Sequence, residues 1–184
     1  MNESTLILTL FAAIGLGTPL VFGTVGEIIT ERAGNLHLGV QGMMLVGAVA
    51  GFWATFNTEN LFLGVIVAML AGAALSVVHA FASVTLRVSQ IVSGLALTIF
   101  GTGLSSFLGE TGSEPLVGEP SKATFEPILE GGLADIPILG PLVFGHDIMV
   151  YVSWLTVAAA SYLSLIHISE PTRPNAPSRM PSSA

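Results

Sequence analysis

The chain has 184 residues, of which 52% are hydrophobic and only 9% are charged. Its mean hydropathy is +0.80, and a soluble globular domain carries roughly 25% charged residues, so we expect an integral membrane protein. The net charge of −7, with five scattered Lys and Arg, argues against a nucleic-acid-binding surface, and the absence of cysteine excludes disulfides and thiolate metal sites.

Long apolar segments follow one another along the chain. Residues 5–22 are almost uninterrupted in their apolar character and would form a helix of about 27 Å, which matches the hydrocarbon core of a bilayer. Pro19 is expected to kink this first span. Further spans are predicted at 36–56, 61–84 and 91–108, and a fifth begins at Ile148 and would reach about residue 167. The pattern predicts an all-α, polytopic helical bundle with about five transmembrane helices.

The stretch 26–51 interrupts this apolar pattern. It contains glycines together with charged and uncharged polar residues, which are Glu27, Glu31, Arg32, Asn35, His37 and Gln41. A charge at the centre of a bilayer costs about 2.5–3.5 kcal/mol, so this cluster is expected at a membrane surface, against other helices or beside a water-filled cavity. The glycines would let the backbone bend or pack closely there, as in the broken helices of transporters.

Two interpretations of the carboxylates in this stretch stay open. Glu27 and Glu31 are four residues apart and would share a helix face, which suits a proton relay. The simpler interpretation is a water-exposed turn with Arg32 as their partner. A small membrane-embedded enzyme using Glu27, Glu31 and His37, or a channel-like bundle, is the alternative function that these residues allow.

Residues 109–147 form a long polar excursion with seven acidic residues, five prolines and a single basic residue, Lys122. We expect this segment to be a mostly extracytoplasmic loop that could return to the membrane surface near 136–144. Arg32 and Arg87 fall in the two turns on the opposite side. Because basic loops are retained in the cytoplasm, the N-terminus is predicted to be extracytoplasmic.

Small residues recur at every fourth position in three of the spans. They are Gly47, Gly51 and Thr55, then Gly64, Ala68, Gly72, Ser76 and Ala80, then Gly94, Thr98, Thr102 and Ser106. Such positions share one helix face and allow close approach in lipid, so they predict a tight bundle. The four histidines lack the spacing of metal ligands, and no catalytic or nucleotide-binding motif is present. No catalytic, cofactor-binding or metal-ligating residue is therefore predicted.

Three segments, GEIITERAGNLHLGVQGMMLVGAVAG (26–51), RVSQIVSGLALTIFGTGLSSFLG (87–109) and IPILGPLVFGHDIMVY (136–151), carry a resemblance to a known family. They resemble the membrane-spanning permease subunits of ATP-binding-cassette (ABC) importers for simple sugars and nucleosides, within the wider group of ribose and branched-chain amino-acid permeases. The resemblance implies a multi-pass protein of the cell membrane that is not itself an enzyme. It also implies ATPase subunits, a second permease subunit, an extracytoplasmic substrate-binding lipoprotein and a nucleoside or simple-sugar substrate.

The resemblance covers most of residues 5–163, so 1–163 is expected to be a partial permease domain. The candidate translocation-path or motif residues in the matching segments are Glu31, Asn35, Gln41, Gln90, Ser93 and Thr98. The family commonly has glutamate at the position of Gln41 and asparagine at those of His37 and Thr98. Residues 164–184 are rich in proline and serine and resemble translated sequencing adapter, so we expect a non-native tail on a fragment that lacks the family's later spans; a genuine disordered tail is the alternative.

Overall fold

The computed structural model describes residues 3–110, 124–129, 131–132 and 136–168. Five long helices follow in order: α1 (Glu3–Arg32), α2 (Val40–Thr58), α3 (Leu61–Ala80), α4 (Gln90–Glu110) and α5 (Ile148–Ile168). Two π-helical turns are also present: η1 (Phe81–Thr85) continues α3, and η4 (Gly140–Phe144) precedes α5. The described residues contain no β-strand beyond one isolated bridge, Pro127 to Asp147. The predicted all-α class is confirmed.

Three helical segments in the described part are long and apolar enough to cross a membrane: Thr5–Arg32, Leu61–Thr85 and Gln90–Gly109. The second and third agree closely with the predicted spans. α2 has 19 residues and begins at Val40 rather than at the predicted residue 36, because the backbone of 35–39 is not helical. α5 ends at Ile168, close to the predicted end of the fifth span. Residues 111–123, 130 and 133–135 of the predicted loop, and the tail from residue 169, lie outside the described residues.

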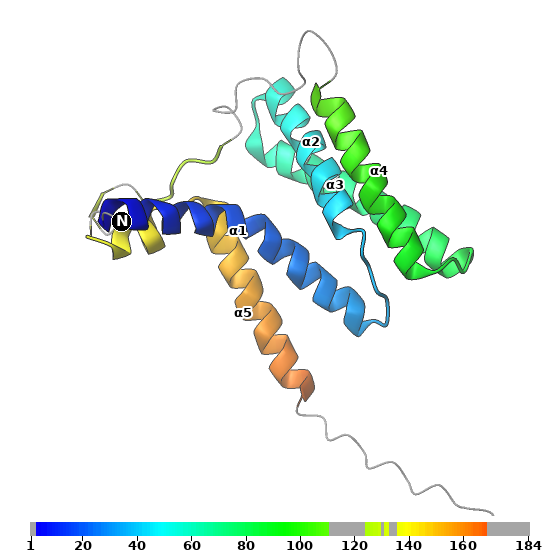
Figure 1. The fold of residues 1–184 in the computed structure, drawn as a ribbon. Helices are drawn as coiled ribbons and strands as arrows, with labels where there is room; N and C mark the ends of the chain where they lie inside the picture. The colour runs from blue at the N-terminus through cyan, green and yellow to red at the C-terminus, as the bar shows by residue number, and fades with distance from the viewer. Residues whose placement is uncertain (1–2, 111–123, 130, 133–135, 169–184) are drawn as a thin grey trace, which may run out of the picture.

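α1 is longer than its predicted span. The apolar run ends at Phe22, but the helix continues to Arg32 and has 30 residues, which is about 45 Å of helix. A hydrocarbon core is about 30 Å thick, so the last turns carry Glu27, Glu31 and Arg32 toward the membrane surface. Pro19 lies inside the helix, and the ribbon changes direction about halfway along (Figure 1).

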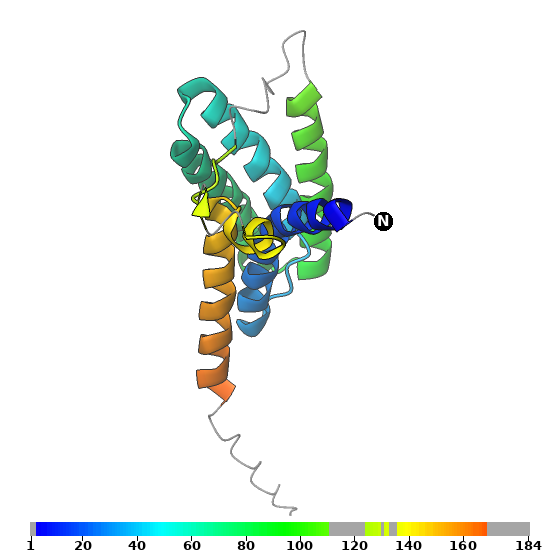
Figure 2. The same ribbon diagram turned by 90° about the vertical axis from the view of Figure 1, so that its left-hand side faces the viewer.

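The helices form two groups. α2 packs against both α3 and α4, whereas α1 packs mainly against α5 and also contacts η4 and α2. α5 extends beyond the other helices at its C-terminal end in both views (Figures 1 and 2). Few apolar side chains are buried, and many large ones, such as Leu16 at 78% exposed, face outward. An outward apolar surface of this kind suits a lipid environment.

Glycines bring the backbones of α2, α3 and α4 together, as the every-fourth-residue spacing predicted. A Cβ added to Gly51 would lie 2.9 Å from the carbonyl oxygen of Gly64, where α2 crosses α3. The prediction is weaker at Gly72, whose added Cβ would meet only the carbonyl oxygen of Met43, at 4.0 Å. The spacing missed Gly101 of α4, whose added Cβ would lie 2.5 Å from the carbonyl oxygen of Gly42.

Candidate functional site

α1 and α2 are separated by a non-helical segment, residues 33–39, which we call the break. Several of the polar residues that the sequence analysis named lie in it or form hydrogen bonds with it. Gly34 has a φ of +87°, its N–H donates to the carbonyl of Glu31 at 2.9 Å, and the N–H of Asn35 donates to that of Thr30 at 3.1 Å. This is the Schellman arrangement, in which a left-handed glycine ends a helix and satisfies its last carbonyls. The Arg32–Ala33–Gly34 sequence was the signal that could have located the end of α1.

Side chains of α4 satisfy the backbone of the break. The Leu36 N–H donates to Oε1 of Gln90 at 3.0 Å, and Nε2 of Gln90 donates to Oδ1 of Asn35 at 2.7 Å. Two turns further along α4, the Thr98 hydroxyl donates to the carbonyl of Leu38 at 2.7 Å. Gln90 and Thr98 are eight residues apart, so the break runs alongside about 12 Å of α4.

Gly94, between these two residues of α4, lets the break approach the helix. A Cβ at this position would lie 2.9 Å from the amide nitrogen of Leu38 and 3.1 Å from that of Gly39. No side chain could occupy this space without moving one of the two backbones. The small residue at 94, predicted as a helix-packing position, is therefore required by the non-helical segment rather than by another helix.

A second set of groups holds the break from α1 and α3. Oε1 of Glu27 accepts from the N–H of His37 at 3.1 Å, and Nδ1 of His37 accepts from the N–H of Gly39 at 3.1 Å. The imidazole of His37 stacks on that of His79, with ring centroids 4.1 Å apart. Nδ1 of His79 lies 3.1 Å from the hydroxyl of Ser93. The two histidines, which no sequence spacing had connected, are neighbours in the fold.

Three atoms of this second set have no hydrogen-bond partner in the described structure: Oε2 of Glu27, Nε2 of His37 and Nε2 of His79. Both imidazoles are more than nine-tenths buried. Buried polar groups normally have a partner, so these three atoms are exceptions to the usual pairing. No group of three or more His, Cys, Asp or Glu side chains among the described residues could hold a metal ion.

The predicted candidate residues divide into two sets. Asn35, Gln90 and Thr98 make hydrogen bonds that hold the break, whereas Ser93 contacts it only indirectly, since its hydroxyl lies against His79, whose ring stacks on His37. Glu31 and Gln41 are exposed and make no side-chain hydrogen bond within the described part of the chain.

The carboxylates of α1 lie in different surroundings. Glu27 is half-buried against His37, whereas Glu31 is exposed. Arg32 pairs with neither in the described structure, since its Nη2 donates to the Ser164 hydroxyl at 2.9 Å. The predicted partnership of Arg32 with the carboxylates is therefore wrong, and the enzyme alternative loses Glu31, which does not join Glu27 and His37.

Comparison with known proteins extends this picture. Residues 9–167 match the family described as the permease component of branched-chain amino acid transport systems. A protein of Haloferax volcanii, provisionally named as a glucose ABC transporter permease, is 42% identical over 147 residues, which cover 79% of this chain and 44% of that protein. The guanosine ABC transporter permease protein of Bacillus subtilis is 31% identical over 160 residues, which cover 81% of this chain and 48% of that protein.

A nucleoside ABC transporter permease protein of Lactococcus lactis is 32% identical over 97 residues, which cover 50% of this chain and 31% of that protein. No solved structure matches. The chain thus spans less than half the length of these curated relatives. The resemblance read from the sequence is confirmed, as is the expectation that the chain is not an enzyme. The apolar helices and the match over residues 9–167 show that the chain belongs to a family of multi-pass membrane permease components of transport systems.

Proposed function

We propose that this chain forms part of the translocation pathway of an ABC importer for a nucleoside or a simple sugar, and that the break at 33–39 lies on that pathway. We take the substrate class from the names of the relatives, which refer to glucose, guanosine and nucleosides. ATP hydrolysis would take place in separate ATPase subunits. A second permease subunit and an extracytoplasmic binding lipoprotein complete the proposed assembly.

The observation that carries this proposal is the non-helical backbone of the break beside α4. The break begins at the membrane surface, directly after Arg32, and runs along α4 from Gln90 to Thr98, which is about 12 Å into the proposed span. Irregular backbone at that depth is tolerated only where protein buries it or where it lines a cavity, and transporters place substrate sites at such breaks. Gln90 and Thr98 act as positioning residues, since their side chains form hydrogen bonds with Asn35 and with the Leu38 carbonyl of the break. Gln41 is exposed in the first turn of α2 and offers an amide that can both donate to and accept from a substrate hydroxyl.

The proposed orientation places Arg32 and Arg87 in the cytoplasm, and the N-terminus and the loop 109–147 outside. A reporter fused after Arg87 is expected to behave as cytoplasmic, and one fused after Gly118 as extracytoplasmic. The opposite pattern would overturn the orientation. We assign residues 1–163 to the permease domain and propose that 164–184 is not needed for assembly of the first four helices.

The function is tested with a chimaera in which residues 9–163 replace the corresponding segment of the Bacillus subtilis guanosine permease. The chimaera, expressed with that protein's own partners, is expected to support ATP-dependent uptake of labelled nucleoside or sugar. Gly94→Leu should abolish uptake because it displaces the break. Gly103→Leu is the matched control, because an added Cβ there has no atom within 4 Å in the described structure.

Three outcomes would contradict the proposal. Uptake that persists with Gly94→Leu would show that the break is not on the pathway. A well-assembled chimaera that conducts solute without ATP would favour the channel-like bundle. Chemical conversion of the substrate by the purified chain would favour the membrane-embedded enzyme.

A further inference from the structure

We propose that the groove between α1 and α5 binds one anionic phospholipid, with an acyl chain along its apolar wall and the phosphate at Arg32. The groove is lined by α1 from Leu20 to Arg32 and by α5 from Val157 to Ser164. Its polar end, Arg32, directly precedes the break at 33–39, but none of the residues that line the groove belongs to the break. The binding itself does not depend on the transport activity; only its assignment to the cytoplasmic leaflet rests on the proposed orientation.

The groove exists because the two helices meet at one end and diverge at the other. Near the start of α5 they pack closely, with the ring of Phe11 stacked on His146 at 4.5 Å and Val150 fully buried. From there the helices separate (Figure 1). The space between them has a volume of about 700 Å³, within the range of pockets that hold small organic ligands.

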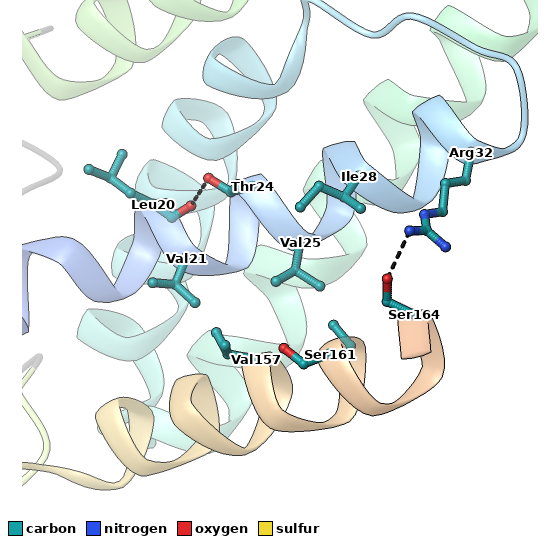
Figure 3. A pocket seen from close by; sticks show the side chains of 10 residues that line it. Leu20, Val21, Thr24, Val25, Ile28, Arg32, Val157, Ser161 and Ser164 are labelled. Atoms are coloured by element: carbon teal, nitrogen blue, oxygen red, sulfur yellow. Dashed lines mark hydrogen bonds between the residues drawn. The ribbon is translucent and has the colours of Figure 1, made fainter. Parts of the chain in front are cut away.

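The wall of the groove suits a hydrocarbon chain. Val21, Val25 and Ile28 of α1 face Val157 and its neighbours on α5 (Figure 3). The distance from Leu20 to Arg32 is twelve residues of helix, or about 18 Å.

The charge at the end of the groove suits a phosphate. Among the described residues that line the groove, Arg32 is the only charged one. A guanidinium has five N–H donors, and one N–H on Nη2 donates to the Ser164 hydroxyl. It forms no ion pair with Glu27 or Glu31 in the described structure. A guanidinium binds phosphate oxygens in a bidentate manner, and basic pockets between transmembrane helices bind anionic head groups.

The test measures lipid retained by the full chain. The chain is extracted from bilayers of equal parts phosphatidylglycerol and phosphatidylcholine, and bound lipid is identified by native mass spectrometry. The wild type should retain phosphatidylglycerol in preference, and Arg32→Gln should reduce that preference about fivefold. Arg32→Lys should keep part of it. Arg87→Gln is the matched control, since Arg87 is exposed, lies on the same proposed side and does not line the groove.

Two further variants test the part of the groove that holds the acyl chain separately from Arg32, which holds the head group. Ala160→Leu should fill the groove and remove both lipids, whereas Ser164→Ala should leave retention unchanged. Circular dichroism establishes that each variant remains helical. Equal retention of the two lipids by the wild type, or equal loss with Arg32→Gln and Arg87→Gln, would overturn the proposal. A dimer without bound lipid would assign the groove to a second copy of the chain and would overturn it too.

Discussion

The α2–α3–α4 group and the α1–α5 pair are both apolar, but they are held together in different ways. In the first group, glycine backbones are in contact, as those of Gly42 and Gly101 are. Polar side chains of this group also hold the break at 33–39. In the second, Gly15, Gly17 and Gly26 of α1 have no neighbour within 4 Å of an added Cβ, and the helices diverge around a groove.

The difference shows which features specify helix packing in lipid. Apolar side chains gain little by leaving lipid for a protein surface, so close backbone approach and hydrogen bonds supply the association energy. The α2–α3–α4 group has both. The α1–α5 pair has a packed end near Phe11 and His146 and an open remainder that a lipid can fill. Substitutions that add bulk should therefore act strongly in the first group and weakly elsewhere.

The largest effect is expected for Gly51→Leu, where α2 crosses α3. An added Cβ would lie 2.9 Å from both the Gly64 carbonyl oxygen and Cβ of Ala68, so the helices must separate at a cost of about 3 kcal/mol or more. Gly72→Leu is the control on the same pair of helices and should cost less than about 1 kcal/mol. Thermal unfolding in detergent measures both. Equal losses of stability in the two variants would mean that α2 and α3 are as close at Gly72 as at Gly51, which would contradict the structure.

A smaller effect is expected for Gly101→Ala at the contact of α4 with Gly42. The new methyl group would be 2.5 Å from a backbone oxygen, and overpacking of this kind costs about 1–3 kcal/mol. Gly103→Ala, two residues along the same helix, meets open space and should be neutral or stabilising by up to about 1 kcal/mol because alanine favours helix. Unfolding in a denaturing detergent titration compares them. If Gly103→Ala were the more damaging, the placement of α2 against α4 would be wrong.

The smallest effect is expected for Thr98→Val, which keeps the side-chain shape and removes the donor to the Leu38 carbonyl. The loss should be about 1 kcal/mol, with faster hydrogen exchange in the break. Thr102→Val is the control, since the Thr102 hydroxyl only donates to the Thr98 carbonyl of its own helix, and it should change stability by less than about 0.5 kcal/mol. Identical rates of hydrogen exchange in the break for the two variants would show that the Thr98 hydroxyl does not position the break.

The sequence was sufficient for features that depend on local pattern. The lengths of the apolar segments predicted the helical spans Leu61–Thr85 and Gln90–Gly109. The spacing of small residues identified Gly51, Gly64 and Gly94 as packing positions. Apolar length failed at the end of α1, because helical backbone tolerates Glu27, Glu31 and Arg32 once they leave the hydrocarbon core. The Schellman glycine, Gly34, was the better signal there.

The candidate site was predicted in part. Asn35, Gln90, Ser93 and Thr98 were named from the sequence, but which groups they contact depends on how α1, α3 and α4 meet. The stacking of His37 on His79 and the contact of Gly101 with Gly42 join residues more than forty positions apart. No spacing rule within one helix can reveal such pairs.

The claim that side chains of α4 hold the break is tested most directly by a double-mutant cycle on Asn35 and Gln90. Their side chains share one hydrogen bond of 2.7 Å, so Asn35→Ala, Gln90→Ala and the double variant should give a coupling energy of about 0.5–1.5 kcal/mol in detergent unfolding. Gln41→Ala combined with Gln90→Ala is the control pair and should be additive. A coupling energy of zero for Asn35 and Gln90 would contradict the account, because the hydrogen bond between these two side chains would then not hold the break against α4.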